Sequence, residues 1–247
     1  VYTCSGWRKR GDRVDVRVVA WRLNQALTRA RLVKPLVTGF PTSSGRHGGC
    51  ALEALRDGSL LVGTGDAAVG SNPRDTTSLG GKTLRLNRFT GKPWPKNPWP
   101  KAKNADRRYV YTFGHRNVQG LAQRRDGSLW SVEQGSWRDD EVNRLRRGGD
   151  YGWDPVPGYD ESVPMTDHSL PGKQVSARWS AGEPTLATSG GTFLYGKQWG
   201  ALSGALAVGV QKAERVLFLT FDGKGRLKKA RAPQALREYG RLRGVTQ

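Results

Sequence analysis

A short phrase, an Asp-Gly-Ser-Leu turn followed by an apolar strand, occurs twice in the chain. The first copy spans residues 57–66 and the second spans residues 126–135. In each copy Asp-Gly predicts a tight turn, and the apolar run predicts a short strand that ends in a glycine-containing loop. A weaker copy at residues 217–225 places the turn after its strand. The repetition favours an all-β fold built from similar antiparallel sheets, such as a propeller.

Strand patterns dominate the rest of the chain, and helix patterns are scarce. Residues 14–23 alternate between apolar and polar with period two, which is typical of a half-buried strand. Further strands are predicted at residues 82–87, 108–113, 190–195 and 205–210. Residues 24–32 and 233–239 are expected to hold a helical turn or two. Because no linker divides the sequence, residues 1–247 are expected to form one domain.

The chain is strongly basic. It has 41 Lys and Arg against 21 Asp and Glu, which gives a net charge of +20, and its nine Trp argue against a disordered polyelectrolyte. Such a charge suits polyanions, but the sequence holds no nucleic-acid reading motif, so no specific nucleic-acid function is expected. Weak, salt-sensitive scaffolding of polyanions stays open as an alternative. No apolar run is long enough for a transmembrane helix.

The ends and the cysteines bear on the origin of the chain. Val1 is not an initiator Met, no signal peptide is visible, and both ends are expected to be cuts within a longer protein. Cys4 and Cys50 are the only cysteines. They form either two buried free thiols or one disulfide, and a disulfide would imply an oxidising compartment.

Polar residues with catalytic potential follow the predicted strands. His47 lies in a glycine-rich loop, His115 follows another strand, and His168 lies in a polar loop. Taken singly, each histidine has a structural interpretation. In a propeller, however, equivalent strand ends meet on one face, where these side chains would converge: His47, Asp66, Arg116, Asn117 and Gln134. A carboxylate beside a histidine would orient the imidazole as a general base.

An acidic run stands out in this basic chain. Residues 138–143 read Arg-Asp-Asp-Glu-Val-Asn. Three carboxylates near backbone carbonyls suit a hard cation such as calcium, although the spacing is not that of an EF-hand. Salt bridges to nearby arginines are the alternative.

An ordered series of motifs carries a family resemblance. The motifs, in chain order, are Arg-His-Gly-Gly-Cys at 46–50, Val-Gly-Thr-Gly-Asp at 62–66, Leu-Gly-Gly-Lys-Thr-Leu-Arg-Leu at 79–86, Gly-His-Arg-Asn-Val-Gln-Gly-Leu at 114–121, Glu-Gln-Gly at 133–135, Asp-Asp-Glu-Val-Asn at 139–143, Gly-Gly-Asp-Tyr-Gly-Trp at 148–153 and Arg-Leu-Arg at 241–243. The series resembles the soluble glucose/sorbosone dehydrogenases that depend on pyrroloquinoline quinone (PQQ), including the aldose sugar dehydrogenases.

The resemblance implies a six-bladed β-propeller that binds PQQ and calcium on its top face. This chain would be incomplete at the N-terminal blade and at the closing C-terminal strand. The glycine and cysteine after His47 resemble an actinobacterial-type subgroup, which implies a Cys4–Cys50 disulfide. A secreted, periplasmic or cell-envelope location is then expected. Gly48 and Ala51 depart from the Asn and Arg that family members often have there.

Individual roles follow by matching positions to the family. His47 matches the general base, Asp66 its carboxylate partner, and Arg116 and Asn117 residues that contact the cofactor. Gly135 and Ser136 match residues that bind the cofactor's calcium, and Gln134 beside them matches a cofactor contact. Glu141 and the Tyr151 carbonyl match a second calcium site. The remaining cofactor matches are Lys212, Arg241 and Arg243.

The sequence therefore predicts an enzyme that oxidises the anomeric carbon of an aldose to a lactone. Hydride would pass to PQQ, His47 would take the proton, and an external acceptor would receive the electrons. The alternative is a non-catalytic propeller that serves as a binding module, because propellers host unrelated functions.

Overall fold

The computed structural model describes residues 1–8, 11, 14–43 and 45–247, which form four antiparallel sheets with little helix. Each sheet is a meander of strands that follow one another in the chain. The first holds β1 (Tyr2–Arg8), β2 (Val14–Leu23) and β3 (Ala30–Phe40); the second holds β4 (Gly49–Ala54), β5 (Ser59–Thr64), β6 (Lys82–Asn87) and β7 (Val110–Phe113); the third holds β8 (Val118–Gln123), β9 (Leu129–Glu133), β10 (Glu141–Leu145) and β11 (Trp179–Ser180); the fourth holds β12 (Thr188–Phe193), β13 (Leu206–Val210), β14 (Arg215–Phe221) and β15 (Leu227–Arg231).

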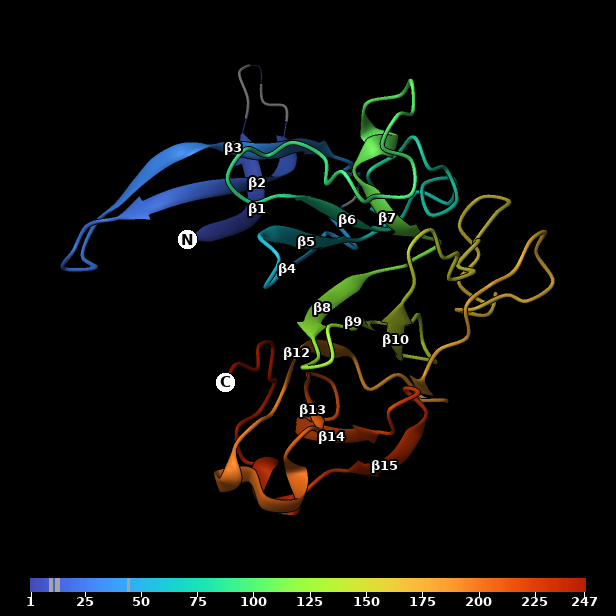
Figure 1. Cartoon of the computed structure of the whole chain (residues 1–247). Coiled ribbons are helices and arrows are strands. Elements are labelled where there is room, and N and C mark those ends of the chain that lie inside the picture. Colours follow the sequence, from blue (N-terminus) through green and yellow to red (C-terminus); the bar gives the residue numbers. More distant parts are fainter. Residues whose placement is uncertain (9–10, 12–13, 44) are drawn as a thin grey trace.

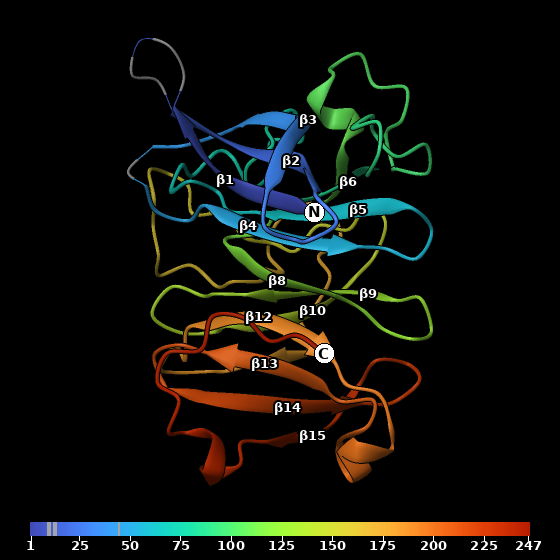
Figure 2. The same cartoon turned by 90° about the vertical axis from the view of Figure 1, so that its left-hand side faces the viewer.

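The four sheets stack face to face in chain order, and their first strands β1, β4, β8 and β12 contact one another along one edge (Figures 1 and 2). This is the arrangement of blades in a β-propeller. The all-β prediction is confirmed. The blade number of six, the single domain and the incompleteness at both ends stay predictions.

Side-chain alternation explains the stacking. In β5, Leu60 and Val62 pack against the first sheet, whereas Leu61 packs against the third sheet. Because successive residues of a strand point to opposite faces, a sheet between two neighbours needs apolar residues at every position. β5 is accordingly buried along its whole length, and its central residues Leu-Leu-Val supply apolar side chains to both faces.

The repeated sequence phrase is a turn stabilised by its own aspartate. The Asp57 carboxylate accepts hydrogen bonds from the Ser59 backbone N–H and hydroxyl, and Asp126 does the same with Ser128. Such a side chain mimics a backbone turn. The turn aligns the first two strands of the second and third sheets.

The helical turns predicted at the β2–β3 connection are wrong. Residues 24–32 form a hairpin turn and the start of β3, because the Asn24 side-chain oxygen accepts hydrogen bonds from the backbone N–H groups of Thr28 and Arg29. The 3-10 helices of the described residues are short: Asp106–Arg108, Lys197–Leu202 and Gln234–Leu236. In the described part of the chain, no helix is long and apolar enough to cross a membrane.

Cys4 and Cys50 form a disulfide, so the predicted pairing is confirmed. The bond joins β1 to β4 and therefore ties the first sheet to the second at the shared edge. Cys50 lies three residues after His47, so the same bond anchors the loop that carries the predicted base.

Replacing both cysteines with serine is expected to lower the free energy of unfolding by about 4 kcal/mol, because the bond closes a long loop in the unfolded chain. The thermal midpoint should fall by roughly 10 °C. Calorimetry with and without a reducing agent checks this: the agent should lower the midpoint of the wild type alone. Equal midpoints for both proteins without the agent would contradict the expectation.

Candidate functional site

Most predicted site residues lie in loops at the same end of the sheets. His47 precedes β4, Asp66 follows β5, Arg116 and Asn117 precede β8, and Gln134 follows β9. Backbone hydrogen bonds join these loops: Asp66 N–H donates to the Arg116 carbonyl and Gln134 N–H to the Asn117 carbonyl. The meander therefore brings together on one face residues that are distant in sequence.

His47 is held by a carboxylate and a phenol. Its Nδ1 lies 2.9 Å from Asp66 Oδ1 and 2.8 Å from the Tyr159 hydroxyl oxygen. The same hydroxyl donates to Asp66 Oδ2 at 2.7 Å. Burial and the charge of Asp66 raise the pKa of Tyr159, so its hydroxyl stays protonated as a donor. The three side chains form a closed hydrogen-bonded triangle.

The Asp66 carboxylate has its full set of donors. It is completely buried and also accepts hydrogen bonds from Trp153 Nε1 at 2.8 Å and from the Ala68 backbone N–H at 2.8 Å. Gly65 must be glycine, because a Cβ there would lie 1.8 Å from the His47 carbonyl oxygen. These contacts fix the carboxylate relative to the imidazole.

This triangle determines the proton position on His47. An ionised carboxylate only accepts, and the Tyr159 hydroxyl already donates to Asp66, so both partners of Nδ1 are acceptors. Nδ1 therefore carries the proton, and the lone pair lies on Nε2. None of the described residues hydrogen-bonds Nε2, and that nitrogen is the one positioned to accept a proton from a ligand.

The loop that follows Asp66 is held by a buried lysine. The Lys82 ammonium donates to the carbonyl oxygens of Asn72, Pro73 and Gly80, and Asn72 in turn donates from its side chain to the Asp66 carbonyl. Burial lowers the pKa of Lys82 to about 7. Lys82 thus supports the site from inside the second sheet.

Arg116 lies beside the histidine triangle. It is 4% exposed, and its Nη1 donates to the carbonyls of Gln134 and Gly135 at 3.1 and 2.7 Å. Its Nη2 donates to Glu161, and its buried Nε has no partner among the described residues. A buried N–H without an acceptor suits a ligand that brings an anionic oxygen. Asn117 is also buried, and its side-chain oxygen accepts from the Gly49 N–H.

Tyr159 and Glu161 are site residues that sequence reasoning missed. Both lie in residues 155–162, which have no strand or helix, and they project onto His47 and Arg116 respectively. Trp153, which precedes this segment, packs its ring 5.6 Å from the Arg116 guanidinium carbon. No periodicity marks the segment, and only the Gly-Trp end of a family motif lies near it.

The acidic run does not converge on one point. Asp140 accepts hydrogen bonds from the backbone N–H groups of Gly135, Leu186 and Ala187, so it fastens two loops together. Asp139 Oδ2 lies 3.5 Å from Arg138 Nε, so this carboxylate forms a salt bridge to a nearby arginine, as the alternative interpretation of the run expects. Within the described ranges, no three His, Cys, Asp or Glu residues are placed to hold a metal ion. The three carboxylates of this run therefore do not form one cluster in the described structure.

Glu141 retains features that suit a cation. It faces Glu133 across the β9–β10 pair, both are buried, and no described Lys or Arg forms an ion pair with either. Burial and the charge of Glu133 raise the pKa of Glu141 to about 8. The Thr166 hydroxyl donates to Glu141, and the backbone N–H of the next residue, Asp167, donates to the Gly152 carbonyl. Glu141 therefore lies near the segment that contains Tyr151.

The other histidines have structural environments. His115 is fully buried, with Nδ1 2.6 Å from Glu133 Oε1 and Nε2 2.7 Å from Thr112 Oγ1, and its ring stacks on Tyr151. His168 is exposed and lies 3.2 Å from the Ser176 hydroxyl. Of the three, His47 is the one that combines a hydrogen-bonded carboxylate with a ring nitrogen to which no described residue bonds.

The last predicted cofactor residues lie in a loop of the fourth sheet and in the C-terminal segment beside it. Lys212 is exposed in the β13–β14 loop, and Arg241 Nη2 lies 3.4 Å from the neighbouring Gln211 side chain. Arg243 is exposed, and its carbonyl accepts from the Gly190 N–H. Among the described residues no hydrogen bond links these three to the His47 triangle. Ser136 is half-buried beside Gly135.

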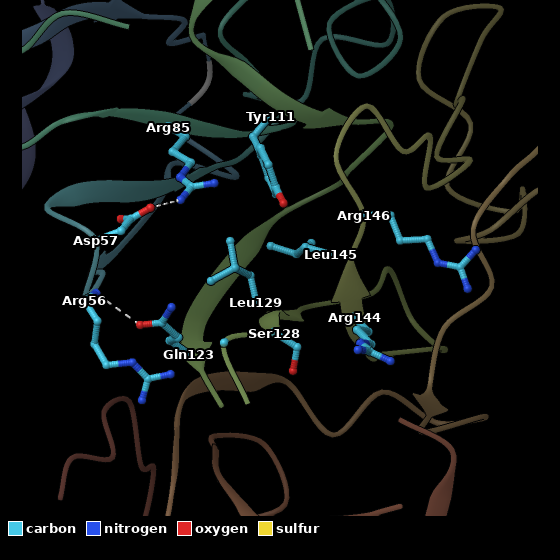
Figure 3. Close-up of a pocket in the computed structure, with 11 residues that line it drawn as sticks. Arg56, Asp57, Arg85, Tyr111, Gln123, Ser128, Leu129, Arg144, Leu145 and Arg146 are labelled. Atoms are coloured by element: carbon cyan, nitrogen blue, oxygen red, sulfur yellow. Dashed lines mark hydrogen bonds and ion pairs between the residues drawn. The ribbon is translucent and has the colours of Figure 1, made fainter. Parts of the chain in front are cut away.

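A cavity of about 570 Å³ lies at the opposite end of the second and third sheets (Figure 3). Three of its arginines already have acceptors. Arg85 pairs with Asp57, Arg56 donates to backbone carbonyls at 2.8 and 3.0 Å, and Arg144 donates to the Lys224 carbonyl. The predicted site residues lie elsewhere, so the chemistry is assigned to the His47 face.

Comparison with known proteins identifies sugar dehydrogenases as relatives of this chain. The sequence model described as Glucose / Sorbosone dehydrogenase matches residues 1–247. Quinoprotein glucose dehydrogenase B of Acinetobacter calcoaceticus is 44% identical over 88 residues, which are 36% of this chain and 18% of that protein. Aldose sugar dehydrogenase YliI of Escherichia coli strain K12 is 31% identical over 134 residues, which are 53% of this chain and 36% of that protein.

A solved structure extends the likeness to nearly the whole fold. The PQQ-bound form of aldose sugar dehydrogenase from Streptomyces coelicolor matches with a TM-score of 0.75 and 25% identity, over 99% of this chain and 65% of that one. The alignments span well under half the length of the two curated relatives. Since the family model nevertheless matches every residue from 1 to 247, the chain belongs to the glucose/sorbosone dehydrogenase family.

Proposed function

We propose that the chain provides the active face of a PQQ- and calcium-dependent aldose dehydrogenase, which converts the anomeric C–OH of a sugar to a lactone. The observation that supports this most strongly is the His47 triangle beside the buried Arg116. The names of the relatives given above agree with the proposal. The proposal also includes an aldose as substrate, an external electron acceptor and a location outside the cytoplasm. The disulfide supports that location, because it fits an oxidising compartment.

His47 acts as the general base. Its Nε2 takes the proton of the anomeric hydroxyl, and the positive charge that forms on the imidazole is stabilised by Asp66 through Nδ1. Tyr159 and Trp153 keep the carboxylate oriented while this charge develops. When bound, PQQ supplies the hydride acceptor, and calcium polarises its reactive carbonyl.

The residues present suit that cofactor. Arg116 offers a buried Nε–H without an acceptor, and its positive charge would stabilise negative charge on a bound quinone. Asn117 and Gln134 would lie beside it, and the backbone carbonyls of Gly135 and Ser136 would hold the calcium. Lys212, from a loop of the fourth sheet, and Arg241 and Arg243, from the C-terminal segment, would contribute positive charge to the cofactor's carboxylates.

A second calcium is proposed at Glu141 and the Tyr151 carbonyl, where it would compensate the buried Glu133–Glu141 pair. Calcium at 100 times its dissociation constant is expected to add about 2.7 kcal/mol to the free energy of unfolding of the wild type. In Glu141→Gln this gain should be mostly lost. Thermal unfolding of the wild type and of Glu141→Gln, each in excess calcium and in chelator, measures the gain and its loss. A wild-type midpoint that ignores calcium would contradict the second site.

The proposed function is tested by titrating the chain with PQQ in calcium and then adding an aldose. Saturable binding followed by conversion of the cofactor spectrum to its reduced form is expected. Binding without reduction would limit the proposal to the cofactor site. Failure of the chain to bind PQQ would favour the non-catalytic propeller.

A further inference from the structure

Glu161 covers the guanidinium on which the proposed cofactor site depends. One of its oxygens, Oε1, accepts from Arg116 Nη2 and also from Arg46 Nη2 at 3.0 Å. The side chain of Arg116 is 4% exposed, whereas that of Glu161 is 35% exposed. Glu161 therefore lies on the solvent side of Arg116.

The fold covers the Nη1 group and one face of the Arg116 guanidinium and leaves Nε without a partner among the described residues. Two backbone carbonyls, of Gln134 and Gly135, accept from Nη1, and the indole of Trp153 lies against the guanidinium. The free Nε–H and the Nη2 group lie on one edge of the guanidinium, so a ligand oxygen that binds Nε competes with the Glu161 carboxylate on Nη2 for that edge. Burial opposes ionisation of Glu161, but the hydrogen bonds and charges of Arg116 and Arg46 outweigh it and lower its pKa, so the group is an anion at neutral pH.

The segment that carries Glu161 lies outside the sheets. Residues 155–162 belong to no sheet, and their internal hydrogen bonds are those of turns, from Asp160 N–H to the Pro155 carbonyl and from Ser162 N–H to the Asp160 side chain. Tyr159 anchors the segment at the histidine triangle, two residues before Glu161. Among the described residues only Arg46 and Arg116 hydrogen-bond the Glu161 carboxylate, so rotation of this side chain alone would uncover Arg116.

We propose that Glu161 is a built-in competitor of the anionic cofactor: its carboxylate and the ligand's anionic oxygen bind the same edge of Arg116, and the ligand displaces Glu161. The inference rests on the proposed function, which assigns Arg116 to the cofactor. Displacement also gives selectivity. A ligand with its own negative charge restores the ion pair with Arg116, whereas a neutral ligand leaves the buried guanidinium without a counter-charge.

The test is equilibrium binding of PQQ, in calcium and at low ionic strength, to three proteins. They are the wild type, Glu161→Gln, and Asp160→Asn as the matched control, which removes one negative charge from the adjacent residue without touching an arginine. Glu161→Gln is expected to bind PQQ roughly tenfold more tightly than the other two, because the internal charge-assisted bond no longer competes. Its thermal midpoint should stay within a few degrees of the wild type, which shows that it is folded.

The outcomes separate the two proposals. If the wild type binds PQQ and Glu161→Gln binds with equal or lower affinity, the competitor role is overturned while the proposed function stands. If Glu161→Gln binds and the wild type does not, the competitor role is supported in its strongest form. If none of the three proteins binds, both proposals fail.

Discussion

Replacing His47 with alanine is expected to lower the turnover of an aldose by roughly 10³-fold, because a positioned general base contributes on this order. Binding of PQQ should change little, since Arg116 and the backbone carbonyls around it do not depend on the imidazole. The measurement is single-turnover reduction of PQQ by the sugar, followed in the cofactor spectrum. This assay separates the chemical step from cofactor binding and from reoxidation.

The matched control is His168→Ala, which removes an exposed imidazole that contacts Ser176. Its rate should equal that of the wild type. A normal rate in His47→Ala would remove this residue as the base. A loss of PQQ binding in His47→Ala would instead show that the imidazole holds the cofactor, and the role given to it here would be wrong.

The fold could be predicted where a pattern is local. Residues 14–23 and 82–87 are β2 and β6 with the predicted bounds, because alternation with period two is visible within one strand. The strand predicted at 190–195 is shifted, since β12 is Thr188–Phe193. The hairpin at residues 24–32 was missed because it depends on one side-chain oxygen of Asn24, and single polar contacts of this kind leave no periodic signal.

The site was predictable only in its paired motifs. His47 and Asp66 each lie in a recognisable glycine-containing motif, and the structure places His47 Nδ1 2.9 Å from Asp66 Oδ1. Tyr159 lies 112 residues from His47 along the chain, in a segment with neither repeat nor period. Its role is visible only once the sheets stack. In the acidic run, residues that are adjacent in sequence do not form a shared site. The carboxylates of Asp140 and Glu141 point in different directions, one to the Gly135 N–H and the other to the Thr166 hydroxyl.

Asp66→Asn is expected to reduce turnover by roughly 10³- to 10⁴-fold, although it changes one atom. An asparagine amide at this position can donate to His47 Nδ1, which moves the imidazole proton to Nε2. The nitrogen that faces the ligand would then be a donor and unable to take the hydroxyl proton. PQQ binding should persist, because Arg116 contacts Asp66 only through the backbone. Single-turnover rates together with nitrogen NMR of the His47 ring report the rate and the tautomer in the same variant.

Two comparison variants isolate the tautomer effect. Asp75→Asn changes an exposed aspartate of the same loop that caps Thr77, and it should leave the rate unchanged. Tyr159→Phe removes one donor to Asp66 and one acceptor for Nδ1 but introduces no competing donor, so its rate should fall only about tenfold, with the proton still on Nδ1. A rate in Asp66→Asn as high as that in Tyr159→Phe, with the proton unmoved, would mean that Asp66 only supports the loop. A large loss accompanied by a proton on Nε2 would establish that the carboxylate selects the reactive form of His47.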